Sequence, residues 1–240
     1  MKKLLSGLLF AVVAMSASAQ QPPEIPPFSK MTPGSPPQGW KPFQLASTKK
    51  NTEYTLISED GVVALKAVAH GSASAMELKT TFDPHKFPMI SFRWKVVQGI
   101  PSANNADVNK EDSPVRVMIG FDGDTSKLGL KEKFASSLAQ TASGQPLPYA
   151  TLMYIWGNKV APDSITVSGR TSRIRMLALD VDDKNVGKWQ SHSRNLVEDF
   201  KRAFNEEPGN VISIQLLSDT DNTNEDSTAF YGDISVGPPR

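Results

Sequence analysis

Between Trp40 and the C-terminus the sequence repeatedly alternates apolar and polar residues, and this period of two restricts the fold more than any other feature. In segment 89–97, Phe92, Trp94 and Val96 fall on one side of an extended chain, and charged or hydroxyl residues fall on the other. Segment 115–121 also alternates, with Val115, Val117, Ile119 and Phe121 on one side and Arg116 and Met118 on the other. Because successive side chains of a strand point to opposite faces, these segments predict strands with one dry and one wet face.

The same alternation and the turn residues between segments predict the other elements. Asp60-Gly61 between two β-prone runs indicates a tight hairpin of 52–58 with 62–68. Further strands are expected at 76–82, 150–156, 172–179, 188–195, 211–217 and 228–236. Segments 127–142 and 197–204 have helical spacing instead. About eleven strands with one or two short helical insertions predict an all-β fold, a two-sheet antiparallel jelly-roll sandwich.

The N-terminus has the pattern of a signal peptide. Lys2 and Lys3 precede an apolar run at 4–15, and the small residues Ala17-Ser18-Ala19 follow it. The run is shorter than the ~20 apolar residues that a membrane-spanning helix needs, and no later segment is as long, so no membrane span is expected. Cleavage after Ala19 would make the protein periplasmic or secreted.

The sequence therefore predicts that the chain has three regions. Residues 1–19 are the signal peptide, residues 20–39 a Pro-rich linker, and residues 40–240 a single β-sandwich domain. Prolines remove amide donors and favour extended chain, which is why 20–39 is interpreted as a linker. Sandwiches of roughly 200 to 250 residues commonly form one domain.

Charge and cysteine content exclude several classes of function. The chain has 26 Lys+Arg and 25 Asp+Glu, and removing Lys2 and Lys3 leaves 24 against 25. A protein so close to neutral has no overall field with which to capture nucleic acid or anionic lipid non-specifically, so nucleic acid is not expected as a partner. The absence of Cys excludes disulfides and thiolate metal sites.

The segment 218–226 is an acidic loop between two strands, and it offers the oxygen ligands that calcium prefers. It is not an EF-hand, because Glu225 stands where the glycine would be and Phe230 where the bidentate glutamate would be. Two interpretations stay open: a solvated hairpin loop without a cofactor, or a structural calcium site. The candidate calcium ligands are Asp122, Asp124, Asp219 and Asp221.

Placing the apolar face of each strand inward leaves a set of polar and aromatic residues as a candidate ligand surface. Arginines offer paired donors to hydroxyls or carboxylates, and aromatic rings offer a face to the C–H side of a sugar. Trp156 ends a strand beside Gly157 and is expected to be exposed, whereas Trp94 is expected in the core. The same arginines could also be ordinary solubilising residues. The candidate ligand-binding residues are Arg116, Tyr154, Trp156, Arg173, Arg175, Gln215, Tyr231 and Asp233.

Catalytic motifs are not found. The three histidines are scattered, and the sequence has neither a H-E-x-x-H zinc motif nor a G-x-S-x-G esterase motif. No catalytic residue is therefore assigned. Whether the protein is an enzyme stays open, although the sequence favours a non-enzymatic role. In the enzyme alternative, Tyr231 or Tyr154 would act as base and an arginine would neutralise a carboxylate of a polysaccharide.

Several segments resemble a bacterial family of secreted proteins catalogued as a domain of unknown function. The resemblance covers residues 28–236 and rests on Lys110-Glu-Asp-Ser-Pro-Val-Arg116, Phe121-Asp-Gly-Asp124, Gln145-Pro-Leu-Pro-Tyr149, Tyr154-Ile-Trp-Gly-Asn158, Ser218-Asp-Thr-Asp-Asn-Thr223 and Ala229-Phe-Tyr-Gly-Asp233. The final hairpin also resembles that of carbohydrate-binding jelly rolls. Carbohydrate-binding jelly rolls often hold a structural calcium. The family is similar to galactose-binding-like jelly rolls, which implies the same fold. The family resemblance implies no activity.

Together these observations favour a non-catalytic periplasmic binding module for a saccharide or another polar cell-envelope component. One alternative is a polysaccharide-active enzyme, a lyase or hydrolase on a jelly-roll scaffold. A second is a structural envelope protein that binds another protein. The oligomeric state is left open.

Overall fold

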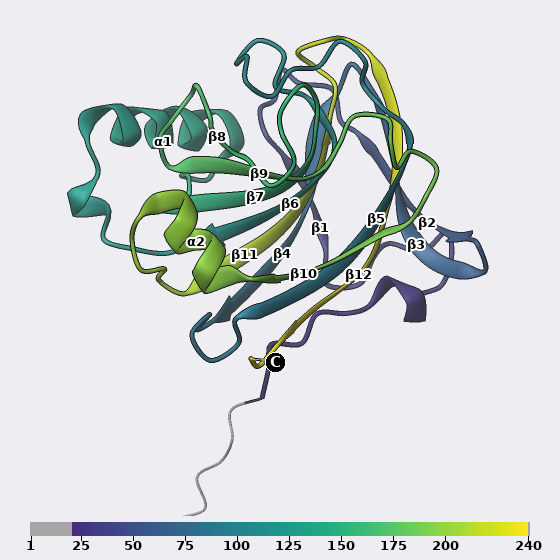
Figure 1. Cartoon of the computed structure of the whole chain (residues 1–240), viewed down its shortest axis with the longest axis horizontal. Helices are drawn as coiled ribbons and strands as arrows, with labels where there is room; N and C mark the ends of the chain where they lie inside the picture. Colours follow the sequence, from purple (N-terminus) through teal and green to yellow (C-terminus); the bar gives the residue numbers. More distant parts are fainter. Residues whose placement is uncertain (1–20, 240) are drawn as a thin grey trace, which may run out of the picture.

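The computed structural model describes residues 21–239, in which two β-sheets pack face to face (Figure 1). The seven-stranded sheet has, in order, β1 (Lys41–Gln44), β4 (Ala73–Phe82), β11 (Val211–Asp219), β6 (Ser113–Phe121), β7 (Ala150–Gly157), β9 (Ile174–Val181) and β8 (Ile165–Val167). The five-stranded sheet has β10 (Gln190–Asn195), β5 (Met89–Gln98), β12 (Asp226–Gly237), β3 (Val62–His70) and β2 (Glu53–Glu59). The helices are α1 (Leu130–Ser143), α2 (Leu196–Phe204) and the 3₁₀ turns η1 (Phe28–Lys30) and η2 (Thr125–Lys127).

The predicted two-sheet sandwich with two helical insertions is confirmed, with one difference in strand direction. Paired strands run antiparallel except β7 and β9, which pair in parallel. They do so because the short strand β8 follows β7 and pairs antiparallel with the outer edge of β9. The edge strand β8 was not predicted, since a strand of three residues is too short to show a clear alternation.

The core lies between the two sheets, and it is filled by the apolar residues that the alternation assigned to the dry face. Phe92 and Trp94 from β5 are buried, and the Phe92 ring lies 5.5 Å from the Tyr154 ring of β7. Trp94 donates a hydrogen bond from its Nε1 to Asp180 Oδ2 at 2.7 Å. Buried indole nitrogens usually find such an acceptor. The prediction that Trp94 belongs to the core is confirmed.

The Pro-rich segment is a packed part of the sandwich rather than only a linker. Ile25 and Phe28 are buried, and the ring of Phe28 lies 5.4 Å from that of Trp40. The backbone N–H of Ser29 donates to Asp233 Oδ1 at 2.8 Å, which ties the segment to β12. The prolines give the chain its extended path, and the apolar residues between them attach it to the core.

Two further expectations concern the signal peptide and membrane-spanning helices. The predicted signal peptide, residues 1–19, lies outside the described residues. Among residues 21–239, no helix combines the length and apolar character needed to cross a membrane.

Candidate ligand-binding groove

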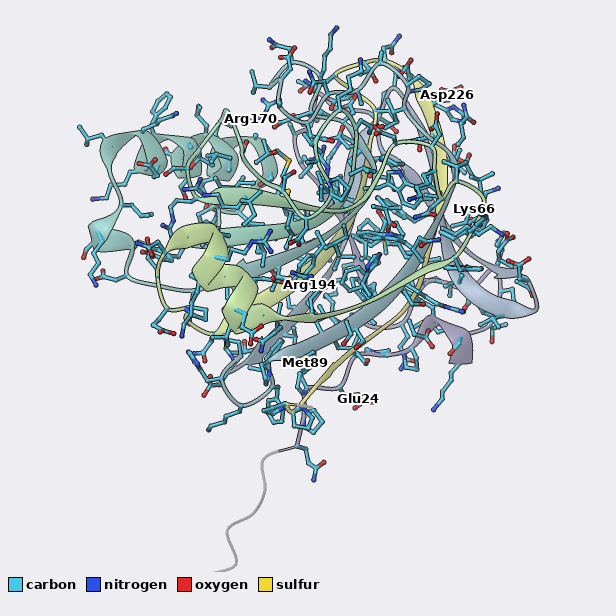
Figure 2. The ribbon with its side chains drawn as sticks, viewed as in Figure 1. Glu24, Lys66, Met89, Arg170, Arg194 and Asp226 are labelled. Atoms are coloured by element: carbon cyan, nitrogen blue, oxygen red, sulfur yellow. The ribbon has the colours of Figure 1, made fainter. Side chains whose placement is uncertain are left out.

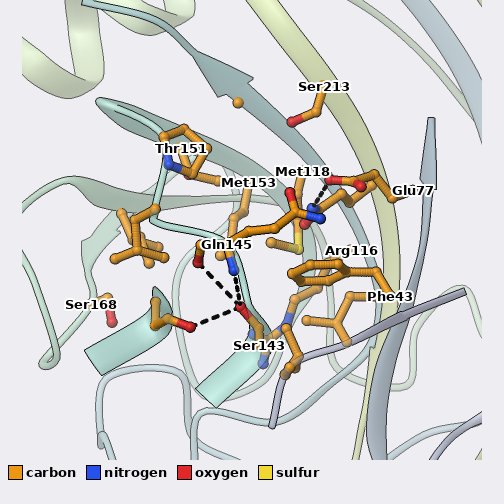
Figure 3. Close-up of a pocket in the computed structure, with 18 of the residues that line it drawn as sticks. Phe43, Glu77, Arg116, Met118, Ser143, Gln145, Thr151, Met153, Ser168 and Ser213 are labelled. Atoms are coloured by element: carbon orange, nitrogen blue, oxygen red, sulfur yellow. Dashed lines mark hydrogen bonds between the residues drawn. The ribbon is translucent and has the colours of Figure 1, made fainter. Parts of the chain in front are cut away.

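The outer face of the seven-stranded sheet carries a groove of about 430 Å³ (Figure 3). Strand alternation creates it: Val117 and Ile119 of β6 point into the core, so Arg116 and Met118 point to the opposite face. The end of α1 and the segment 145–148 after it form one wall, and Phe43 of β1 lies at another side. The volume lies within the range of about 300 to 1,000 Å³ that is usual for small-molecule sites.

A row of residues in register crosses the floor of the groove. Met118 on β6 pairs with Met153 on β7, which pairs with Met176 on β9. In the other direction Met118 pairs with Gln215 on β11, and Gln215 pairs with Glu77 on β4. The row therefore changes from polar to apolar across the sheet, with adjacent strands about 4.8 Å apart.

The three methionines belong to a second buried apolar cluster, separate from the core between the sheets. Its other buried members are Ala75, Ile155, Ala178 and Leu217. Methionine side chains are unbranched and polarisable, so they adapt to irregular apolar surfaces. The floor is thus suited to contact with an apolar body of varied shape.

A hydrogen-bonded polar group forms one side of the groove. Gln215 Nε2 donates to Glu77 Oε1 at 2.8 Å, and Lys79 Nζ lies 3.0 Å from the same oxygen. Lys79 Nζ also donates to Gln145 Oε1 at 2.7 Å, which connects β4 to the segment after α1. Glu77 is buried by these contacts. Amide and ammonium groups held in this way can exchange partners with hydroxyls of a ligand.

Arg116 defines the charged end of the groove. Its Nη2 donates to the backbone O of Glu111 and lies 3.3 Å from Asp219 Oδ2. Its buried Nε has no hydrogen-bond partner among residues 21–239. Glu111 accepts a hydrogen bond from Arg170 Nε at 2.9 Å, and Arg170 is labelled in Figure 2. This end therefore alternates cations and carboxylates.

Beside Arg116, the carboxylates of Asp112, Asp219 and Asp221 lie within 4.8 Å of one another. Asp112 accepts hydrogen bonds from Thr223 N and Oγ1, both at 2.7 Å. Burial raises the pKa of Asp219 well above its usual value, and Arg116 only partly opposes this. Burial also opposes ionisation of Asp221, but hydrogen bonds with Asp219 and Lys49 lower the pKa of Asp221 overall. Of the two carboxyl groups, Asp219 is therefore the harder to ionise.

This cluster offers three of the six to eight oxygen ligands that calcium takes. Asp221 Oδ1 is buried and has no hydrogen-bond partner in the described part of the chain, so it has a free acceptor. Lys49 forms an ion pair with Asp221, and a cation bound here would have to displace it. The fit is partial, and calcium stays a prediction.

Asp122 and Asp124 do not join this cluster, so the expected four-aspartate site does not form. β6 and β11 are antiparallel, with Ser113 opposite Asp219 and Phe121 opposite Val211. Asp122 therefore lies at the other end of the strands from Asp219. Asp124 instead caps η2, accepting a hydrogen bond from Ser126 N at 3.0 Å.

Of the eight predicted ligand-binding residues, Arg116 and Gln215 line the groove. Three aromatic ones are in the core instead, which corrects the expectation that they face a ligand. Trp156 and Tyr154 alternate with the floor residues of β7, and loop residue Asn105 covers the end of that strand by accepting from Asn158 N at 2.6 Å. A β-bulge after Tyr231 shifts the alternation of β12 and leaves Tyr231 inward.

The buried tyrosines also cannot act as bases on a groove ligand. Burial raises the pKa of Tyr154 and of Tyr231 well above the usual value. The Tyr231 hydroxyl donates to the backbone O of Leu217 at 2.8 Å and accepts from Arg116 N at 3.2 Å. It therefore supports the groove floor from beneath, by joining β12 to β11 and β6.

The other three predicted residues lie outside the groove and the core, with Arg173 and Arg175 together beside the Phe204 ring and Asp233 apart from them. Arg173 forms an ion pair with Glu206 at 2.8 Å and lies over the Tyr149 ring, beside a second hollow that Asp122 and Asp124 also line. The guanidinium of Arg175 lies 5.6 Å from the centre of the Phe204 ring. Asp233 accepts from Ser29 in the N-terminal segment. The predicted surface is thus divided among four regions of the molecule.

Sequence reasoning missed the methionine row. The alternation assigned Met118 to the wet face, although the residues before and after it, Val117 and Ile119, are apolar. The available signal is that the exposed-face positions of 115–121 and 150–156 include Met118, Met153 and Ile155. Strands that are apolar on both faces indicate that each face is covered or binds something.

The chain belongs to the family described as "Protein of unknown function (DUF3047)", whose model matches residues 38–235. No curated protein matches the sequence significantly. Solved structures with a similar fold include an arabinose-bound GH51 α-L-arabinofuranosidase, at 9% identity and TM-score 0.44, over 91% of this chain and 26% of that one. The chain thus spans about a quarter of the length of that enzyme.

Two other similar structures are nearly the same length as this chain. The cellulose-specific carbohydrate-binding module CBM28 has 12% identity and TM-score 0.38, with 90% of this chain and 92% of that one covered. A cyclase from Fischerella sp. TAU has 10% identity and TM-score 0.39, with 90% and 96% covered. These similarities are too distant to assign a function.

Proposed function

For this member of a family without an assigned function, we propose a non-catalytic binding role in which the outer groove of the seven-stranded sheet holds a small amphipathic ligand. The observation that carries the proposal is the row in register across the floor. An apolar body would lie over Met118, Met153 and Met176, and its polar group would meet Gln215 and Glu77. A site with an apolar lining and a few placed polar groups is typical of small-molecule binding.

A saccharide is the second candidate, and one observation favours it. Glu77, Lys79, Gln145 and Gln215 form a connected set of donors and acceptors along one side of the groove. Such a set can bind neighbouring hydroxyls, while the C–H face of a sugar rests on the methionines. The aromatic rings expected to stack on a sugar are in the core, so the apolar floor favours the amphipathic ligand.

We further propose that the protein acts in the periplasm or outside the cell, after cleavage following Ala19. The support is the order of charged, apolar and small residues at the N-terminus. A polysaccharide-active enzyme and a structural protein that binds another protein remain the alternatives, and the experiment below includes an outcome for each.

The binding test uses decyl maltoside below its micelle concentration, decanoate and maltose as probes, with calorimetry as the readout. We expect decyl maltoside and decanoate, each with a ten-carbon chain, to bind and maltose to bind at least about tenfold more weakly, since burial of each CH₂ contributes about 0.8 kcal/mol. Equal binding of maltose and decyl maltoside would support the saccharide instead. Binding of none of the three would contradict a small-molecule role and leave the protein-binding alternative.

Two variants locate the ligand. Met153→Gln places an amide in the middle of the apolar row and should weaken decanoate binding, whereas Met89→Gln on the other sheet should not. Gln215→Leu should weaken decyl maltoside binding more than Gln190→Leu on β10. Melting curves check that each variant folds. Mass spectrometry of the recovered probe checks catalysis, because cleavage of its glycosidic bond would contradict the non-catalytic role.

A further inference from the structure

The two α-helices differ in where their apolar residues point. Those of α2 face the core, and those of α1 face away from the protein. α2 buries Leu196, Phe200 and Phe204, and the ring of Phe200 lies 4.7 Å from that of Phe121 in the core. Every residue of α1 is described, and none of them is buried. An amphipathic helix on a globular protein normally turns its apolar face to the core, as α2 does. α1 is therefore the exception.

The large apolar side chains of α1 form one exposed stripe. Leu130, Phe134 and Leu138 follow one another at intervals of four residues, so they lie along one side of the helix. Their exposed fractions are 88%, 65% and 54%, the highest of any large apolar side chains among residues 21–239. Side chains of α1 project away from the sandwich (Figure 2).

The opposite side of α1 faces the protein with small and polar residues. Ala139 and Ser143 line the groove, and Glu132 accepts a hydrogen bond from Ser172 Oγ at 2.7 Å. These contacts fix the orientation of the helix, so the apolar stripe faces away from the sandwich. α1 lies at the periphery of the molecule in Figure 1.

The charge around the stripe indicates its partner. Segment 124–143 contains three lysines, Lys127, Lys131 and Lys133, and two acidic residues, Glu132 and Asp124, the latter 3.8 Å from Lys127 Nζ. At 100° per residue, Lys131 and Lys133 lie on either side of the stripe, while Glu132 faces Ser172. A helix with Leu and Phe on one side and lysines beside them is typical of helices that lie in the surface of an anionic membrane.

We propose that α1 docks the protein on an anionic lipid surface, with Leu130, Phe134 and Leu138 inserted among the lipids and the three lysines near their headgroups. The near-neutral charge of the whole chain does not oppose this, because the basic and apolar residues are gathered on α1 and the η2 turn just before it. Docking would also bring the groove, which α1 borders, close to the membrane. The proposal does not depend on what the groove binds.

The test is co-sedimentation of the protein with lipid vesicles. The protein used is the secreted form, and mass spectrometry defines its N-terminus. We expect binding to equimolar phosphatidylglycerol and phosphatidylcholine and much weaker binding to phosphatidylcholine alone. Replacing each lysine by Gln should weaken binding about fivefold, since a lysine near an anionic surface contributes about 1 kcal/mol. Added salt should weaken the wild type more than the lysine variants.

Matched variants separate the stripe from general surface effects. Leu130→Ser, Phe134→Ser and Leu138→Ser together should abolish sedimentation, and Val97→Ser, a comparably exposed apolar residue on β5, should leave it unchanged. Lys184→Gln is the matched control for the lysines. Equal binding to neutral and anionic vesicles, or no loss in the triple variant, would overturn the proposal. Dimerisation of the wild type through α1 would also overturn the proposal. Light scattering would then show a dimeric wild type and a monomeric triple variant.

Discussion

At the scale of single residues, the pattern of alternation determines which side chains reach the core, but only where the strand is regular. Trp94 was expected in the core and is fully buried between the sheets. Trp156 was expected at an exposed loop and is just as buried, with its Nε1 donating to the backbone O of Asp182 at 2.8 Å. Trp156 is in phase with Leu152 and Tyr154, so the alternation of β7 continues into the core up to the end of the strand.

These positions lead to a prediction that differs from the one made on sequence alone. Trp94→Ala and Trp156→Ala should each lower the free energy of unfolding by about 3 to 5 kcal/mol, because each empties a buried aromatic site. Trp189→Ala is the control, since this ring lies on the outer face with the Arg93 guanidinium 4.5 Å away. Chemical denaturation gives the values. A loss for Trp156→Ala as small as for Trp189→Ala would show that the ring is exposed.

At the scale of elements, short-range signals predicted the turns well. Asp60 and Gly61 have φ values of 51° and 78°, and Glu59 pairs with Val62, so the predicted hairpin is confirmed with these two residues as its loop. The acidic loop between β11 and β12 is different. Asp219 and Asp221 meet Asp112 from the loop before β6, a partner that no spacing within the loop indicates.

The calcium hypothesis belongs to this loop. If Asp112, Asp219 and Asp221 bind calcium, the ion stabilises the folded state, and calcium at 100 times its dissociation constant should add about 2.7 kcal/mol. We expect a higher melting temperature in calcium than in magnesium at equal ionic strength. Asp219→Asn with Asp221→Asn should abolish the difference, and Asp122→Asn with Asp124→Asn should not. Identical melting in calcium, magnesium and chelator would identify an ordinary hydrogen-bonded loop.

At the scale of the whole molecule, the two sheets differ in what their outer faces carry. The outer face of the seven-stranded sheet holds the groove, and α1 borders it.

Location outside the cytoplasm stays a prediction from the first nineteen residues. Mass spectrometry of the secreted protein should find Gln20, or its cyclised form, as the first residue. Detection of an intact Met1 in the extracytoplasmic fraction would contradict cleavage after Ala19.

The sequence by itself determined the strand-rich fold, the hairpin at Asp60-Gly61 and the two helical segments, because these depend on the order of neighbouring side chains. It also identified Arg116 and Gln215 as outward-facing. Only the tertiary structure decided that Met118, Met153 and Met176 align across three strands, because register between distant strands depends on how the whole sheet packs. The same holds for α1, whose helical spacing was visible in the sequence, but whose outward-facing stripe is set by contacts with other elements.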